Sequence, residues 1–110
     1  MTIKILVLEG CERCQNFKKI LDINLIRYEL MPCEKYPEQC DGIESTTGTS
    51  TYPIVLLANS KNEVLEVVYQ AEKYTQLMEG RKTELGISYI PLHSIDNIIN
   101  YVVNKLKLKK

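Results

Sequence analysis

The chain has 110 residues, of which 45% are hydrophobic and 25% are charged, as is typical of a folded globular protein and not of a disordered one. A chain of this length can bury one sizeable core without help from disulfides or metals, so we expect residues 1–110 to form a single domain. Its 14 basic and 14 acidic residues cancel, which gives no electrostatic basis for binding nucleic acid or a membrane surface.

Hydropathy and cysteine content bear on where the chain works. No apolar run approaches the roughly 20 residues that a membrane span requires. Residues 1–8 lack the charged start and the apolar middle of a signal peptide. We therefore expect a cytoplasmic protein, and we treat it as a monomer. Thiols stay mostly reduced in that compartment. The four cysteines therefore indicate catalysis or metal binding more strongly than structural disulfides.

The first third of the chain predicts a strand, a helix and a second strand. Residues 3–8 are an apolar run typical of a buried strand, and residues 12–21 carry apolar side chains at helical spacing. Residues 25–30 alternate apolar and polar side chains, which is the period of a half-buried strand. The short return from helix to strand makes this a βαβ unit, so the two strands should be parallel.

The middle of the chain predicts a short helix followed by a hairpin. Pro37 suits the first turn of a helix over residues 37–46, because the N–H that proline lacks would have no partner there. Residues 54–58 and 64–69 have strand character. The polar residues 59–62 between them indicate a tight turn, so this pair of strands should be antiparallel.

The last part of the chain predicts one or two helices. After Gln70 helical spacing returns in a segment that Gly80 would end, and a weakly extended piece follows around residues 87–90. Ser94 would cap a final helix whose apolar stripe faces the core. The stripe consists of Ile95, Ile98, Ile99, Val102 and Leu106. Together the elements predict an α/β fold in which helices flank a small mixed sheet of four strands.

The sequence Cys11-Glu12-Arg13-Cys14 is the most distinctive chemical motif in the chain. It joins the first predicted strand to the first predicted helix, where two cysteines can close a small disulfide ring. Helix N–H groups at this position favour a thiolate on the first cysteine, which Arg13 would support and Glu12 would oppose. This is the chemistry of thiol–disulfide exchange, although cysteine pairs of this spacing also bind metals.

Cys33 and Cys40 form a second pair with a wider spacing, and His93 is the one histidine of the chain. The spacing is not that of a zinc knuckle, so we expect no metal at either cysteine pair. The two thiols could remain free or bond to each other, because the sequence does not give the Cα separation that bonding requires.

The tripeptide Thr51-Tyr52-Pro53 precedes the strand predicted over residues 54–58. A proline there is commonly a simple strand start, whereas a cis bond would hold the preceding backbone open for pairing with an extended substrate. Together with the dithiol motif, the tripeptide resembles the pattern of the glutaredoxins, over residues 2–70 and the final helix. The resemblance implies a thioredoxin-like fold in which a cis Pro53 packs against the dithiol. It also implies glutathione as the co-substrate that donates electrons.

The resemblance further implies a role for individual residues. Cys11 would attack a disulfide as a thiolate and Cys14 would resolve the mixed disulfide, so the chain would be a glutathione-dependent thiol–disulfide oxidoreductase. Its substrates would be protein disulfides or glutathione mixed disulfides. Three segments would bind glutathione, through Arg13, Thr51, Tyr52, Pro53, Asp96 and Asn97.

The dithiol motif itself departs from the glutaredoxin pattern. Glu9 and Gly10 stand where glutaredoxins commonly have a basic residue, and Glu12 and Arg13 replace the usual Pro-Tyr between the cysteines. Losing that proline changes the start of the helix, and the opposed charges leave the sign of the effect on the thiol pKa open.

The region before the final helix departs as well. His93 and Ser94 replace a Gly-Gly pair beside the expected γ-glutamyl site, and residues 71–93 are an insertion. The insertion could be surface decoration, or a lid or docking element that changes substrate choice. Two other functions therefore stay open: a binding module of the same fold with weak redox activity, and the binding of a glutathione-ligated iron–sulfur cluster.

Overall fold

The computed structural model describes residues 1–71 and 86–107, and the helix predicted to end at Gly80 lies outside them. The elements in chain order are β1 (Thr2–Val7), α1 (Glu12–Ile23), β2 (Glu29–Pro32), α2 (Pro37–Thr47), β3 (Ile54–Ala58), β4 (Val64–Gln70), β5 (Ser88–Leu92) and α3 (Ile95–Lys107). Among the described helices, none has the length and apolar character needed to cross a membrane.

The strands form one mixed sheet in the order β2-β1-β3-β4-β5. β1 and β2 are parallel, as predicted for a βαβ unit, and β3 and β4 form the predicted antiparallel hairpin. β1 also pairs with β3 in the antiparallel sense, with Ile5 opposite Val55. This order places β3 in the middle of the sheet, and all five of its residues are buried.

The prediction of a four-stranded sheet is wrong, because β5 adds a fifth strand beside β4. β5 runs parallel to β4, with Val68 opposite Ile90. The sequence signal for this strand was weak because Tyr89 is its one buried residue, so burial does not alternate along it. Pro91 weakened the signal further, since proline is tolerated in a sheet chiefly in outermost strands.

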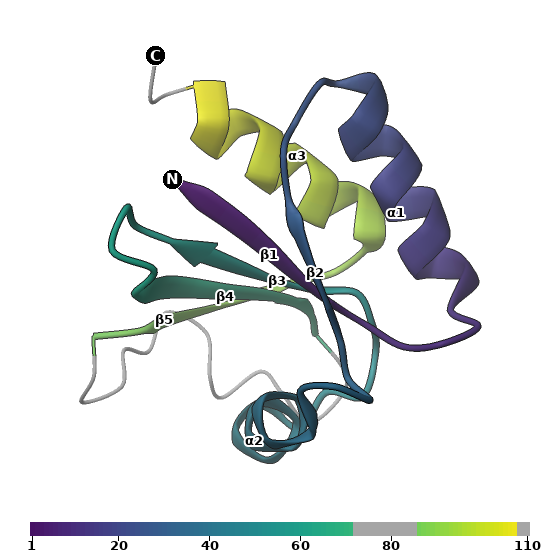
Figure 1. Cartoon of the computed structure of the whole chain (residues 1–110), viewed down its shortest axis with the longest axis vertical. Helices are drawn as coiled ribbons and strands as arrows, with labels where there is room; N and C mark the ends of the chain where they lie inside the picture. The colour runs from purple at the N-terminus through teal and green to yellow at the C-terminus, as the bar shows by residue number, and fades with distance from the viewer. Residues whose placement is uncertain (72–85, 108–110) are drawn as a thin grey trace.

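Helices cover both faces of the sheet (Figure 1). α1 and α3 pack on one face, where Phe17, Ile98 and Val102 belong to a single buried cluster with residues of β1, β3 and β4. α2 lies on the other face, and its Cys40 belongs to a second buried cluster that also contains Tyr69 of β4. The apolar stripe predicted for the final helix therefore faces the core.

The helix ends follow the signals in the sequence. The Ser94 Oγ accepts a hydrogen bond from the backbone N–H of Asn97 at 3.2 Å, which is the predicted cap of α3. α2 has Pro37 at its start, as predicted, and ends at Gly48, whose φ of 76° is accessible to glycine at little cost.

The end of α1 explains why β2 starts later than predicted. α1 runs on to Ile23, and Leu25 follows in a left-handed conformation with a φ of 57°. The Ile26 N–H bonds to the Leu21 carbonyl at 2.9 Å, and the Leu25 N–H bonds to the Asp22 carbonyl at 3.0 Å. This pair of bonds is a Schellman motif with leucine where glycine is preferred. Leu25 and Ile26, which were predicted to begin the strand, therefore end the helix instead, and β2 begins only at Glu29.

Replacing Leu25 by glycine should stabilise the fold by about 1 kcal/mol, because the left-handed conformation is costly for a residue that has a Cβ. Little packing is lost, since the Leu25 side chain is 91% exposed. Urea unfolding measures the change. Leu25→Ala is the matched control, because alanine removes the apolar side chain and keeps the Cβ. Equal stability of the glycine and alanine variants would contradict this account of the turn.

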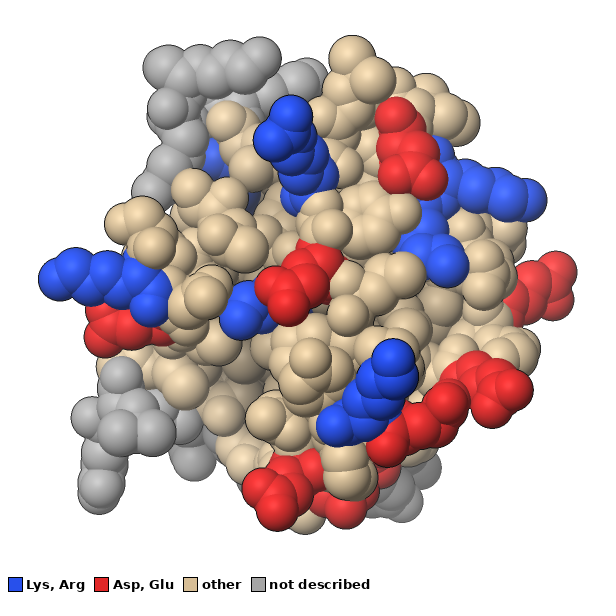
Figure 2. Space-filling view, in the orientation of Figure 1, with Lys and Arg blue, Asp and Glu red and all other residues tan. Residues whose placement is uncertain are grey.

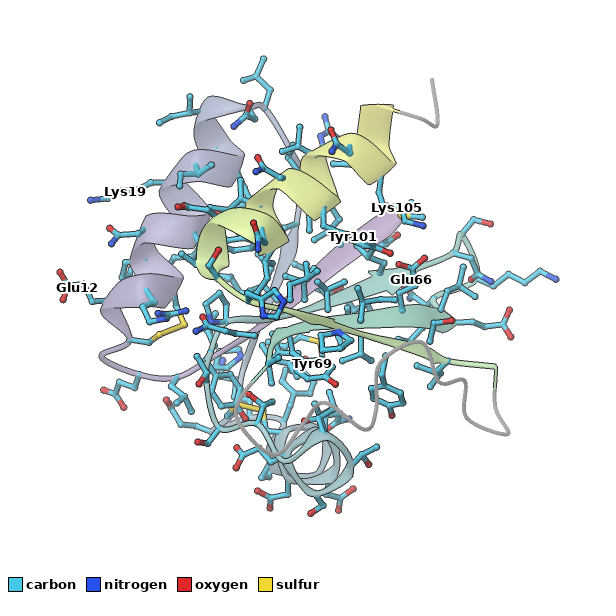
Figure 3. All side chains as sticks on the ribbon, turned by 180° about the vertical axis from the view of Figure 1, so that it is seen from behind. Glu12, Lys19, Glu66, Tyr69, Tyr101 and Lys105 are labelled. Atoms are coloured by element: carbon cyan, nitrogen blue, oxygen red, sulfur yellow. A yellow bond between two sulfur atoms is a disulfide. The ribbon has the colours of Figure 1, made fainter. Side chains whose placement is uncertain are left out.

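A polar cluster links α3 to the sheet. Glu66 of β4 accepts hydrogen bonds from the Tyr101 hydroxyl and, at 2.9 Å, from the Lys105 Nζ. Figure 3 shows these three side chains together where α3 crosses β4. Burial and the hydrogen bond to Glu66 raise the pKa of Tyr101 from 10.0 to about 12. The hydrogen bond to Glu66 raises the pKa of Lys105 as well.

The cluster should lose its stabilising effect in alkaline solution. A raised pKa means that the folded state holds the Tyr101 proton more tightly than the unfolded chain, so the contribution is complete below pH 10.0 and is lost as the pH rises to about 12. Replacing Tyr101 by phenylalanine should therefore cost about 1 kcal/mol at neutral pH and much less near pH 12. Urea unfolding of both proteins at the two pH values measures this. A cost that does not change with pH would contradict the prediction.

Candidate functional site

One edge of the sheet gathers the residues that the sequence marked as functional. β1, β2, β4 and β5 all end at this edge, and β3 begins there, because β3 is antiparallel to both of its neighbours. The loop after β1, the turn before β3 and the start of α3 therefore become neighbours in space. Crevices beyond the carboxyl ends of strands are frequent binding sites in α/β sheets.

Cys11 and Cys14 form a disulfide across the first turn of α1, with their Cα atoms 5.2 Å apart. Cys11 is the N-cap residue of the helix, and its sulfur accepts a hydrogen bond from the Cys14 N–H at 3.1 Å. Gly10, with a φ of 74°, turns the chain just before the pair. Cys14 is only 2% exposed, whereas Cys11 is half-buried, so a reactant reaches the pair through the Cys11 sulfur.

The turn before β3 faces this disulfide. The Tyr52-Pro53 peptide bond is cis, and the Tyr52 carbonyl oxygen lies 4.0 Å from the Cys11 sulfur. The structure thus brings together the two motifs, Cys11–Cys14 and Thr51-Tyr52-Pro53, that are far apart in the sequence.

Arg13 links the turn before β3 to the end of β4. Its Nε donates to the Tyr52 carbonyl oxygen at 3.3 Å, and its Nη2 donates to the side-chain oxygen of Gln70 at the end of β4. Glu12, beside it, points outward from the start of α1 (Figure 3). Gln70 could not be recognised from the sequence, because its contact with Arg13 forms only when the chain is folded.

The Tyr52 side chain connects the turn to α2. Its hydroxyl donates to the Glu44 carboxylate at 2.5 Å, and Tyr52 is 3% exposed. Burial, reinforced by this hydrogen bond, raises the pKa of Tyr52 well above its ordinary value. The Thr49 hydroxyl donates to the Gln70 carbonyl at 3.0 Å, which fixes the segment between α2 and the turn. Neither Glu44 nor Thr49 stood out in the sequence.

Two grooves flank Arg13. The first has a volume of about 520 Å³ and is lined by the turn after β1, by Cys11 and by the segment Ser50–Tyr52. The second, of about 420 Å³, lies between α1 and α3 and is lined by apolar side chains of both helices and by Arg13, Asn16, Lys19 and Asp96. Both volumes are within the range of small-molecule sites in proteins.

Of the two residues of α3 that were predicted to bind glutathione, one lines a groove and the other does not. Asp96 lies in the first turn of α3 and lines the groove between the helices. Asn97 is exposed, lines neither groove, and uses its backbone N–H for the Ser94 cap. His93 is exposed as well. Asp96 therefore lines the same groove as Arg13, whereas Asn97 is not part of the site that the described residues form.

Cys33 and Cys40 also form a disulfide, with Cα atoms 5.8 Å apart. Cys33 follows β2, and its N–H bonds to the Val7 carbonyl at the end of β1, at 2.9 Å. Cys40, in the first part of α2, is 2% exposed. The structure thus pairs two cysteines for which the sequence left both a free and a bonded state open.

The charges near the site are mixed. Figure 2 shows basic and acidic side chains interspersed on one face of the molecule, with acidic ones more frequent toward the end where Figure 1 places α2. α2 itself carries Glu38, Asp41 and Glu44 and has no basic residue. In residues 1–71 and 86–107, no three or more His, Cys, Asp or Glu side chains are arranged to hold a metal ion.

Comparison with known proteins gives no family for this chain. No protein-family model matches the sequence, and no curated protein matches it significantly.

Proposed function

We propose that the chain is a thiol–disulfide oxidoreductase of glutaredoxin type with a thioredoxin-like fold. Cys11 is the attacking cysteine, Cys14 is the resolving cysteine, and glutathione is the co-substrate that restores the dithiol. We place this activity in the cytoplasm, in a monomer that acts on protein disulfides and glutathione mixed disulfides.

One observation carries the proposal. A half-buried cysteine and a buried cysteine are bonded across the first turn of α1, and the Tyr52 carbonyl of the cis turn lies 4.0 Å from the accessible sulfur. This arrangement supports redox chemistry because it exposes one sulfur to an attacking thiol and protects the other from it. It also places backbone polar groups of the turn beside the reacting sulfur, where an extended substrate could pair with them.

The reaction is a pair of thiol–disulfide exchanges. The Cys11 thiolate attacks one sulfur of the substrate disulfide and expels the other as a thiolate, which takes up a proton. The Cys14 thiolate then attacks the Cys11 sulfur and releases the second substrate thiol, leaving the Cys11–Cys14 disulfide. Two electrons and two protons pass to the substrate, and two molecules of glutathione reduce the disulfide while becoming glutathione disulfide.

Groups at the start of α1 would stabilise the Cys11 thiolate. The Cys14 N–H already donates to the Cys11 sulfur at 3.1 Å, and a negative charge at this position interacts favourably with the helix dipole. Arg13 adds a positive charge nearby, and its guanidinium is held in place by the Tyr52 carbonyl.

Glutathione would occupy the groove of about 520 Å³ beside Cys11, which Thr51 and Tyr52 line. Its cysteinyl backbone would pair with the backbone of Tyr52. The Tyr52 carbonyl accepts from Arg13, so Arg13 would have to share or leave this oxygen when a substrate pairs there.

Equilibration with glutathione tests the proposal. The protein is incubated at several ratios of reduced to oxidised glutathione, quenched with acid and alkylated, and mass spectrometry locates the alkylated cysteines. We expect Cys11 and Cys14 to change together from a disulfide to two thiols as the ratio rises. In a Cys14→Ser variant we expect a glutathione adduct on Cys11, because the resolving thiol is missing.

Two results would overturn the proposal. In the first, Cys11 and Cys14 keep the same redox state at every ratio of glutathione. In the second, the adduct of the Cys14→Ser variant forms on a cysteine other than Cys11.

A second candidate function is a binding module of the same fold that turns over slowly. The contacts of Arg13 favour it, because Arg13 occupies the Tyr52 carbonyl and is itself held by Gln70. A substrate that needs this oxygen would bind weakly, and the site would then serve to recognise a partner and not to reduce it.

The variant Arg13→Ala separates the two functions by the sign of its effect. If Arg13 assists glutathione, its loss should raise the KM for glutathione about tenfold, because a charge-assisted contact is lost. If Arg13 blocks the site, its loss should increase the turnover number. Steady-state rates at several glutathione concentrations measure both quantities, and Arg13→Lys is the control that keeps the charge. Unchanged KM and turnover would contradict a role for Arg13 in either function.

A further inference from the structure

The cysteine pair outside the proposed dithiol repeats the arrangement of the first pair. β1 is followed by Cys11 and by a helix that contains Cys14, and β2 is followed by Cys33 and by a helix that contains Cys40. β1 and β2 are parallel neighbours, so both pairs lie beyond the same edge of the sheet. Cys14 and Cys40 belong to the same buried cluster, and Cys11 and Cys33 pack against it.

The two pairs also share an asymmetry of exposure. Cys33 is half-buried, as Cys11 is, whereas Cys40 and Cys14 are each 2% exposed. An external thiol can therefore approach the second disulfide through Cys33 alone. The buried partner would leave as a thiolate in the first part of α2, where the helix dipole offsets part of its charge and Glu38 opposes that effect.

The backbone around this second pair is held by hydrogen bonds that do not depend on the disulfide. The Cys33 N–H bonds to the Val7 carbonyl at 2.9 Å, and the Tyr36 N–H bonds to the Pro32 carbonyl at 3.1 Å. The Cys40 N–H bonds to the Tyr36 carbonyl at 3.2 Å. Opening the disulfide leaves this frame in place, so the sulfurs can part and rejoin without unfolding of the chain.

We infer that Cys33–Cys40 is a second redox-active disulfide, which accepts an electron pair from a dithiol reductant. One thiolate of the reductant attacks the Cys33 sulfur, the Cys33–Cys40 bond breaks, and Cys40 takes up a proton. The second thiol of the reductant then attacks the mixed disulfide, which releases Cys33 as a thiol and leaves the reductant as a disulfide. Two electrons and two protons pass to the chain.

Dithiothreitol is the probe for this inference, because it is a small dithiol that reaches half-buried sulfurs. The protein is equilibrated at several ratios of reduced to oxidised dithiothreitol, quenched with acid and alkylated after denaturation. Mass spectrometry of peptides then gives the state of each cysteine, and circular dichroism of the unquenched samples reports whether the chain stays folded. We expect Cys33 and Cys40 to pass together from a disulfide to two thiols while the chain remains folded.

The variant Cys11→Ser with Cys14→Ser separates this inference from the proposed function. We expect its remaining pair to titrate at the same ratios of dithiothreitol as in the unchanged protein. The reverse variant, Cys33→Ser with Cys40→Ser, should lose the step of the second pair and keep that of the first. The inference therefore stands even if the chain shows no activity with glutathione.

Two results would overturn the inference. If Cys33 and Cys40 stay bonded at every ratio at which the chain is folded, the disulfide is structural and opens only on unfolding. If they are alkylated even at the most oxidising ratio, the two sulfurs do not form an exchangeable bond in solution.

Discussion

Replacing Cys11 by serine should lower the glutathione-dependent reduction of a small disulfide by at least about a thousandfold. The serine hydroxyl can still accept the hydrogen bond that the Cys14 N–H donates at 3.1 Å, so the start of α1 should keep its geometry. It is not ionised at neutral pH, however, and it cannot form a disulfide. The loss would therefore report on the chemistry of the sulfur and not on the fold. Initial rates in an assay coupled to a glutathione reductase measure it.

Cys14→Ser is the matched comparison for this experiment. It removes the buried sulfur and keeps the accessible one, so it should retain activity on glutathione mixed disulfides, which need a single attacking cysteine. The same variant should lose the reduction of protein disulfides, which needs the resolving step. A Cys11→Ser protein that keeps more than a small fraction of its activity would contradict the assignment of Cys11 as the nucleophile.

Replacing Phe17 by alanine should cost about 3–5 kcal/mol of the free energy of unfolding. Phe17 is fully shielded from solvent in the cluster between α1 and the sheet, where Ile5 and Val55 also lie. Its removal leaves a cavity that neighbouring side chains fill only in part. Because small domains have only about 5–15 kcal/mol of stability, the variant should be close to unfolding at physiological temperature. Urea unfolding followed by circular dichroism measures the loss.

Two controls separate cavity formation from other effects on α1. Phe17→Leu keeps an apolar side chain at the position and should cost much less, about 1 kcal/mol. Lys19→Ala changes an exposed residue on the same helix, which points away from the sheet in Figure 3, and should alter stability by no more than about 0.5 kcal/mol. Equal costs for Phe17→Ala and Phe17→Leu would contradict tight packing of α1 on the sheet.

The parts of the fold that the sequence predicted are those with a regular apolar pattern. β3 is buried along its whole length, and α1 and α3 each present one apolar face to the sheet, so periodicity was sufficient for them. β5 was predicted only as a weakly extended piece, because it has a single buried residue, Tyr89. The start of β2 was misplaced because Leu25 and Ile26 complete the end of α1 through backbone hydrogen bonds, which side-chain periodicity does not reveal.

The site divides in a similar way. Cys11, Cys14, Tyr52 and Pro53 could be named in advance, because the residue types themselves carry the chemistry or the turn. Gln70 could not be named, because a glutamine at the end of a strand has no distinctive chemistry until a neighbouring arginine contacts it.

Two further features depend on how the folded chain brings residues together. The bond between Cys33 and Cys40 required their Cα separation of 5.8 Å. Asn97 was predicted to bind glutathione because it stands where the glutaredoxin pattern has a binding residue. In the folded chain only its neighbour Asp96 lines the groove beside Arg13.

The two outermost described strands, β2 and β5, each carry a proline, which limits how another chain could extend the sheet. The Cys33 N–H points to β1 and the Leu92 carbonyl points to β4, where it accepts from Ala71, so the backbone of Pro32 and of Pro91 faces away from the sheet. A strand from another molecule that tried to extend the sheet would find no N–H at these positions. At Pro32 and Pro91 the described part of the sheet therefore disfavours the addition of a strand from another molecule.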